Sequence, residues 1–163
     1  MLYDKLDLGC ADKKPDGYIG VDIGYFKYPK GEFIKADINK RLPFKDRSFI
    51  EVRALQAIEH IDNNRKVFFM KEVCRVLKNN GVFIAEFPPP LKSDGTANSS
   101  FFVDPTHYSW WMPGTFCCFC MSWRVTNNFV DIYEKGYGID TQFEYYNYYW
   151  IENETYHIEL IKI

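Results

Sequence analysis

The 163-residue sequence lacks the features that would assign it to a membrane or to a secreted class. It opens with no charged segment followed by an apolar one, and none of its apolar runs approaches the roughly 18 residues of a membrane span. Its five cysteines are an odd number, which does not fit a fully paired disulfide framework. These absences predict a reduced, cytoplasmic protein without a membrane segment.

An excess of charge of one sign is also absent, because 20 Lys and Arg stand against 22 Asp and Glu. A net charge of -2 offers no broad attraction to nucleic acid or to an anionic membrane. Cys117, Cys118 and Cys120 have no second Cys or His pair at ligand spacing. We therefore interpret these cysteines as packing residues, and the sequence predicts neither a metal site nor a nucleic-acid partner.

What the sequence has in abundance is apolar and aromatic residues, at 47% and 18% of the chain. That is enough for one core, and it predicts a single domain over residues 1–163. One amphipathic helix is expected over Asn64–Lys78, where Asn79-Asn80-Gly81 ends it. The expected strands are Leu2–Leu8, Tyr18–Ile23, Glu32–Ile38, Phe49–Leu55, Gly81–Phe87, Phe143–Ile151 and Tyr156–Ile163.

The order of these elements predicts an α/β fold. A strand, a helix and a strand in succession imply a right-handed parallel crossover, so the sheet should be mostly parallel. Only Glu152-Asn153-Glu154-Thr155 separates the last two strands, which is typical of an antiparallel hairpin. The nine residues between Leu8 and Tyr18 are too few for a helical crossover.

Alternation within the strands indicates that one face of the sheet is incompletely covered by helices. Leu6 and Leu8 alternate with Lys5 and Asp7, whereas a strand covered on both faces would be apolar throughout. Either water or a second subunit then covers the polar face, and a homodimer is the sharper of these two alternatives.

The stretch from Leu6 to Asp22 carries the first chemical signal. Two short apolar runs flank a polar loop that contains Gly9, and the second run ends on Asp22. A glycine lets the backbone approach a ligand closely, and a carboxylate at the end of a strand can accept hydrogen bonds from ribose hydroxyls. The pattern predicts a nucleoside-bearing cofactor.

This stretch resembles motif I of the class I S-adenosylmethionine (SAM) dependent methyltransferases, Asp-x-Gly-x-Gly-x-Gly, with matches at Asp7 and Gly9 and a looser one at Ala11. Residues 42–49 (LPFKDRSF), 58–61 (IEHI) and 75–78 (RVLK) are similar to later motifs of that family, in the same order and at the family's spacing. The resemblance covers about residues 5 to 90 and is to compact, type 11-like members. It implies a Rossmann-like fold with SAM as cofactor.

The resemblance also implies a role for individual residues. Asp7, Gly9, Cys10 and Ala11 would lie beside the methionine part of SAM, Asp22 would hold the ribose, Asp37, Ile38 and Ile23 would hold the adenine, and Leu55 and Gln56 would border the sulfonium. Without a cofactor, Asp22 and Asp37 could equally form strand-end turns, and Asp7 could be a solvated strand residue.

The catalytic candidates lie after the fifth strand, in Asp104-Pro105-Thr106-His107-Tyr108. His107 can accept a proton near neutral pH and Asp104 can orient it, although such a histidine can also serve only to hold its loop. We interpret Glu59 and His60 as structural. The aromatic residues around the loop either line an acceptor pocket or pack the loop; they are Phe101, Phe102, Tyr108, Trp110 and Trp111.

The motifs that accompany methylation of DNA are absent, and no basic tail points to RNA. By elimination, the sequence predicts transfer of a methyl group to an oxygen or nitrogen of a small-molecule or glycan-type acceptor. The alternative is a SAM-binding, catalytically inactive domain with an interaction or scaffolding role.

Overall fold

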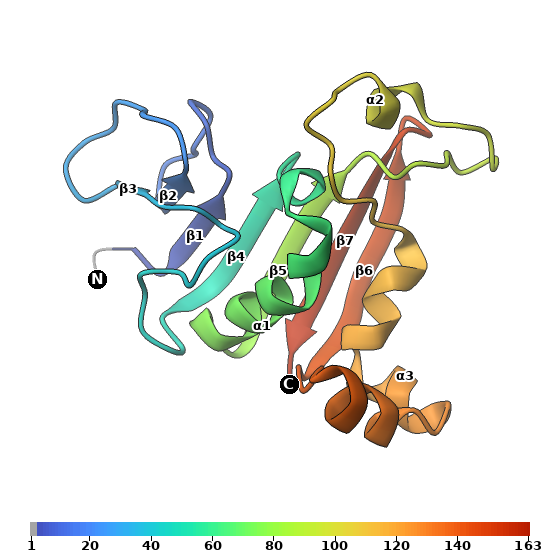
Figure 1. The fold of residues 1–163 in the computed structure, drawn as a ribbon. Coiled ribbons are helices and arrows are strands. Elements are labelled where there is room, and N and C mark those ends of the chain that lie inside the picture. The colour runs from blue at the N-terminus through green and yellow to red at the C-terminus, as the bar shows by residue number, and fades with distance from the viewer. Residues whose placement is uncertain (1–2) are drawn as a thin grey trace.

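The computed structural model describes residues 3–163 and builds them around one sheet of seven strands (Figure 1). The strands are β1 (Lys5–Leu8), β2 (Tyr18–Asp22), β3 (Phe33–Lys35), β4 (Phe49–Leu55), β5 (Leu77–Phe87), β6 (Phe143–Ile151) and β7 (Thr155–Lys162). Their order is β3-β2-β1-β4-β5-β7-β6, and β7 runs antiparallel to both of its neighbours while the other pairs are parallel. The α/β class, the mostly parallel Rossmann-like sheet and the C-terminal antiparallel hairpin are confirmed.

The helical segments among the described residues are short, and all of them follow β4. They are η1 (Ile58–His60), η2 (Asn63–Arg65), α1 (Lys66–Val76), α2 (Ser99–Phe102), η3 (Pro113–Phe119), α3 (Met121–Thr126) and the π-helical turn η4 (Ile132–Gly136). In Figure 1, α1 crosses one face of the sheet over β4 and β5, and α3 lies beside the β6 edge. Among residues 3–163, no helix combines the length and apolar character needed to cross a bilayer.

Helix α1 ends earlier than its sequence signal predicts. The predicted end was Lys78, but the helix stops at Val76, and Leu77 already belongs to β5. Leu77 is fully buried and pairs with Phe49, so its packing in the sheet replaces a further turn of helix. At the other end of the sheet, β1 begins at Lys5; the predicted start, Leu2, lies outside the described residues.

The core lies between α1 and the face of the sheet that the helix covers. Phe69, Met70 and Val73 of α1 are fully buried, and they belong to the same cluster as Val52 and Phe83 of the sheet. The helix also buries a charged residue, Glu72. Its carboxylate accepts a hydrogen bond of 2.8 Å from the Leu42 amide and binds Arg75 at 2.7 Å, which satisfies its buried oxygens.

The opposite face of the sheet has no helix over its β1–β2–β3 half, because no helix lies between these strands among the described residues. Polar side chains occupy this face and pair with one another across strands. Lys5 binds Glu51 at 3.0 Å, and Arg53 binds Asp7 at 2.9 Å. The prediction that one face is incompletely covered by helices is confirmed.

Candidate active site

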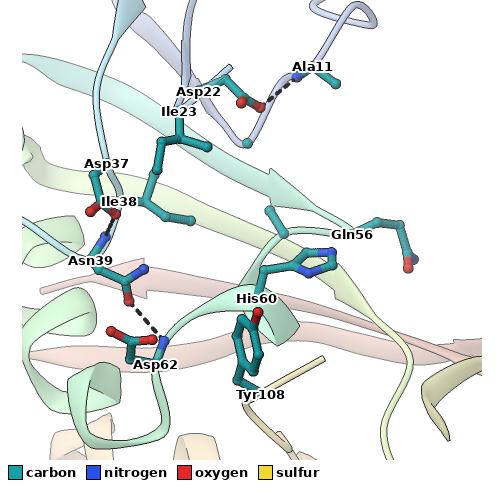
Figure 2. Close-up of a pocket in the computed structure, with 12 residues that line it drawn as sticks. Ala11, Asp22, Ile23, Asp37, Ile38, Asn39, Gln56, His60, Asp62 and Tyr108 are labelled. Atoms are coloured by element: carbon teal, nitrogen blue, oxygen red, sulfur yellow. Dashed lines mark hydrogen bonds between the residues drawn. The ribbon is translucent and has the colours of Figure 1, made fainter. Parts of the chain in front are cut away.

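A cavity of about 520 Å³ opens at the carboxyl ends of β1, β2, β3 and β4 (Figure 2). Ligands of open parallel sheets bind at this edge, because the loops that follow neighbouring strands meet there. The lining residues follow those four strand ends, with one addition from the loop after α2. They are Gly9, Ala11, Asp22, Ile23, Asp37, Ile38, Asn39, Gln56, Ala57, His60, Asp62 and Tyr108.

The cavity is acidic. Its lining includes the carboxylates of Asp22, Asp37 and Asp62, and no lysine or arginine is among the described residues that line it. Only Asp37 of the three has a lysine within ion-pair distance in the described chain, Lys40 at 3.4 Å. Such a site favours a cationic ligand and disfavours a diphosphate.

Asp22 sits at the end of β2, where its side chain joins the two loops that border the cavity. One carboxylate oxygen accepts from the Ala11 amide at 3.0 Å and the other from the Gly24 amide at 2.8 Å. Each carboxylate oxygen has two lone pairs, so acceptor capacity is left for a ligand. Figure 2 shows the Asp22 carboxylate turned toward Ala11.

The apolar part of the cavity is formed by two isoleucines from neighbouring loops. Ile23 is 67% exposed although it lines the cavity, and Ile38 lies next to it in Figure 2. Asp37 turns the loop at this point, since its carboxylate accepts from the Asn39 amide at 2.9 Å. An exposed branched side chain beside a polar loop is suited to packing against a flat ring.

Gly9 is required here for a reason other than close approach to a ligand. Its φ is +69°, and a Cβ built on it would lie 2.5 Å from the Cβ of Ala57. The backbone after β1 therefore packs directly on the segment after β4. This contact holds together the ends of β1 and β4, two of the strands whose ends form the cavity.

Ala11 occupies a left-handed conformation, with φ of 44°. An alanine there costs roughly 1–2 kcal/mol, part of which glycine recovers, so we expect Ala11→Gly to stabilise the fold by about 0.5–1 kcal/mol. The melting temperature should rise by about 1–4 °C in a thermal unfolding experiment. Ala54→Gly, at a buried strand position of ordinary φ, should lower it; a fall for Ala11→Gly as well would contradict the strain.

Seven of the ten predicted cofactor residues line the cavity, and three do not. Asp7 is buried in β1 and holds Arg53, and burial raises the pKa of its carboxyl. Cys10 is buried against Gly20, and burial raises the pKa of its thiol to about 12. Leu55 ends β4 without reaching the cavity wall. The structure thus places these three as supporting residues around the strand ends.

The two predicted catalytic residues lie beside the cavity. Asp104 Oδ2 is 3.7 Å from His107 Nε2, and hydrogen bonds from Thr106 lower the pKa of Asp104. The His107 side chain is only 8% exposed, and the histidine that lines the cavity is His60, whose ring centre lies 4.9 Å from that of His107.

Glu59 and His60 were interpreted as structural from the sequence. Their surroundings include features that a structural role does not explain. Glu59 is 1% exposed, its carboxylate oxygens have no hydrogen-bond partner among the described residues, and burial raises its pKa to about 8. His60 Nδ1 lies 3.0 Å from the Thr106 carbonyl oxygen. The motif Ile58-Glu59-His60-Ile61 directly follows a strand end, and this position is the sequence signal that could have placed both residues at the site.

The aromatic residues near this loop divide between both predicted roles. Trp111 is buried, donates to the Ile58 carbonyl at 2.8 Å and stacks on Phe116, so it packs the loop onto the domain. Tyr108 is 57% exposed and lines the cavity.

The sequence analysis missed two residues that line the cavity, Asn39 and Asp62. The Asp62 amide donates a hydrogen bond of 2.8 Å to Asn39 Oδ1, which joins two of the loops that line the cavity.

Comparison with known proteins shows what the sequence and the fold are similar to. Residues 20–85 match the methyltransferase domain model. A SAM-dependent methyltransferase from Archaeoglobus fulgidus superposes with a TM-score of 0.64 at 20% identity, over 98% of this chain and 86% of that one. A SAM-dependent methyltransferase from Mesorhizobium loti gives 0.61 at 12% identity, over 99% and 92%.

A third structure, of a complex between the Trm112 methyltransferase activator and a methyltransferase of Haloferax volcanii, gives a TM-score of 0.64 at 13% identity, over 97% of this chain and 81% of that one. No curated protein matches the sequence at a significant level. The match at residues 20–85 includes all three acidic residues that line the cavity, Asp22, Asp37 and Asp62. The chain has the fold of the SAM-dependent methyltransferases to which it is compared, and its residues 20–85 match the model of the methyltransferase domain.

Proposed function

We propose that the chain binds SAM in this cavity and transfers its methyl group to an oxygen or nitrogen atom of a small-molecule or glycan-type acceptor. The observation that carries the proposal is the acidic lining at the carboxyl ends of the parallel strands. SAM carries a sulfonium and an ammonium against one carboxylate, so its net charge is positive. A cavity with three carboxylates attracts such a ligand and repels the diphosphate of a nicotinamide cofactor.

The proposed cofactor contacts use the residues that line the cavity. The Asp22 carboxylate accepts hydrogen bonds from the ribose hydroxyls, and Asp37 accepts from the adenine amino group. Ile23 and Ile38 pack on the adenine ring, and the Ile38 amide donates to a ring nitrogen. The backbone around Gly9 and Ala11 faces the methionine part, and Gln56 borders the sulfonium, with Asp7, Cys10 and Leu55 in support.

Methyl transfer requires alignment of the acceptor atom, the methyl carbon and the sulfur. The new bond to the methyl group forms as the carbon–sulfur bond breaks, and the sulfur keeps the electron pair. An acceptor hydroxyl also loses a proton, and the sequence-based proposal gives that proton to His107, oriented by Asp104. Nδ1 of His107 lies 2.8 Å from the Phe101 carbonyl oxygen, which leaves Nε2 as the nitrogen that can accept the proton. Asp104 Oδ2, 3.7 Å from Nε2, would stabilise the positive charge that the ring then carries.

The inactive, scaffolding alternative draws on the open face of the sheet. No helix covers the β1–β2–β3 half of that face among the described residues. In this alternative, a second copy of the chain docks there and forms a homodimer.

The free thiols of all five cysteines are consistent with the expected reducing, cytoplasmic surroundings.

Two measurements on one preparation test the proposal. We expect S-adenosylhomocysteine at about 100 times its dissociation constant to stabilise the fold by roughly 2.7 kcal/mol, which raises the melting temperature by about 5–10 °C. We also expect S-adenosylhomocysteine to form from SAM when a panel of hydroxyl and amine acceptors is added. Tight binding without turnover on any acceptor would favour the scaffolding role instead.

A further inference from the structure

Three side chains beside the cavity come together although the proposed cofactor contacts do not use them. Glu59 and His60 follow β4, and His107 follows α2. Each offers one ligand atom, a carboxylate oxygen or a ring nitrogen, and these three atoms lie within 4.8 Å of one another. His60 also lines the cavity, so the group borders the space assigned above to the reactants.

The buried carboxylate of Glu59 lacks a hydrogen-bond partner among the described residues. Its side chain is 1% exposed, and neither of its oxygens has such a partner within the described chain. A buried carboxylate is retained at a cost unless a donor or a cation satisfies it.

The two histidines are held in the orientation that metal ligands require. His60 Nδ1 lies 3.0 Å from the Thr106 carbonyl oxygen, and His107 Nδ1 lies 2.8 Å from the Phe101 carbonyl oxygen. A carbonyl oxygen can only accept, so each Nδ1 carries the proton and each Nε2 keeps its lone pair. A backbone carbonyl on one ring nitrogen, with the other nitrogen left to bind the metal, is the usual arrangement around a bound metal. Asp104 Oδ2 lies 3.7 Å from His107 Nε2, which is beyond hydrogen-bond distance.

We propose that Glu59, His60 and His107 bind a divalent transition-metal cation. Two imidazoles and one carboxylate suit Zn²⁺, Mn²⁺ or Fe²⁺ and leave coordination positions open. Zinc ligands about 2.0–2.2 Å from the metal lie about 3.3 Å apart in a tetrahedral site, so the ligand atoms need to approach one another by at most about 1.5 Å.

The remaining histidine provides a contrast within the same chain. His157 also lies among carboxylates, but its Nδ1 binds Glu86 at 2.9 Å and its Nε2 binds Glu159 at 3.0 Å. Its ring stacks on Tyr149 with the centres 4.4 Å apart. Both nitrogens are therefore occupied, and this site has no lone pair to offer a metal.

If the chain is the proposed methyltransferase, a metal at this site would favour acceptors that carry a hydroxyl group. This consequence rests on the proposed function. An acceptor hydroxyl bound to the cation loses its proton more readily, because the cation stabilises the alkoxide. The proton passes to solvent, the alkoxide oxygen forms the bond to the methyl carbon, and the carbon–sulfur bond breaks with its electron pair on sulfur. In this arrangement His107 binds the cation instead of acting as the base.

The test is calorimetric titration of the full chain, stripped of metal with a chelator, with ZnCl₂ and separately with MnCl₂ in the absence of SAM. We expect a single equivalent to bind. Glu59→Gln, His60→Gln and His107→Gln should each weaken binding at least about 100-fold, since even the residues behind metal ligands contribute 10–100-fold. His157→Gln should leave the affinity unchanged, and Glu59→Gln, which keeps the side-chain volume, should remain folded by circular dichroism.

Failure to bind either metal, or variants of the three ligands that bind as tightly as the parent, would overturn the proposal. Melting shifts with S-adenosylhomocysteine, measured on the same samples, keep the two ideas separate. Metal uptake without such a shift would contradict the proposed function and support the metal site. A shift without metal uptake would do the reverse.

Discussion

Replacing Asp22 with alanine should abolish the rise in melting temperature that S-adenosylhomocysteine produces. Two hydrogen bonds from ribose hydroxyls to a carboxylate contribute about 1.5–3 kcal/mol each, so their loss should weaken binding at least about 100-fold. The same variant loses the bonds from the Ala11 and Gly24 amides, which hold the two loops at the cavity. Thermal unfolding with and without ligand measures both effects.

Two further variants separate the ligand contact from the loop contact. Asp22→Asn keeps one acceptor oxygen and so one of the two loop hydrogen bonds, and we expect it to destabilise the fold less than Asp22→Ala while binding the ligand much more weakly than the parent. Asp140→Ala removes an exposed carboxylate whose partner is Lys71, away from the cavity, and should change nothing. An Asp22→Ala protein with the full ligand-induced shift would remove Asp22 from the site.

Gly9→Ala should cost the fold about 2–5 kcal/mol, because it adds left-handed backbone strain of roughly 1–2 kcal/mol to an overpacking cost of about 1–3 kcal/mol. The new Cβ would lie 2.5 Å from that of Ala57, so the segments after β1 and β4 must separate. We expect the melting temperature to fall by about 4–20 °C and ligand binding to weaken, as thermal unfolding and titration would measure.

A double-mutant cycle with Ala57→Gly divides that cost. Removing the Ala57 methyl relieves the clash and leaves the backbone strain, so the double variant should recover part of the loss and the two substitutions should couple. Strict additivity of the two substitutions would show that the clash does not exist and that strain alone makes glycine necessary at position 9.

The fold was predictable where local pattern and tertiary packing agree. Short apolar and aromatic runs identified all seven strands, and alternation within some of them indicated the open face of the sheet. The end of α1 was misplaced because Asn79-Asn80-Gly81 is a strong local stop signal, whereas the burial of Leu77 beside Phe49 depends on a strand distant in the sequence. The burial of Glu72 was not predictable for the same reason, since its partner is the amide of Leu42, 30 residues earlier.

The site was predictable where a residue's role follows from its position at the end of a strand. Asp22 and Asp37 stop or follow strands, and both line the cavity. Asp7 has the same chemistry, but alternation along β1 turns it to the other face of the sheet, where Arg53 holds it. Glu59 and His60 could not be assigned from the sequence, because the loop that surrounds them, near Thr106, lies 46 residues away.

The central claim is that an acidic cavity at the strand ends binds SAM. Isothermal titration of the full chain with SAM, and separately with NAD, tests it most directly. The account predicts one SAM site per chain that Asp22→Ala eliminates, and no measurable binding of NAD, whose diphosphate the cavity carboxylates repel. Binding of NAD without binding of SAM would contradict it.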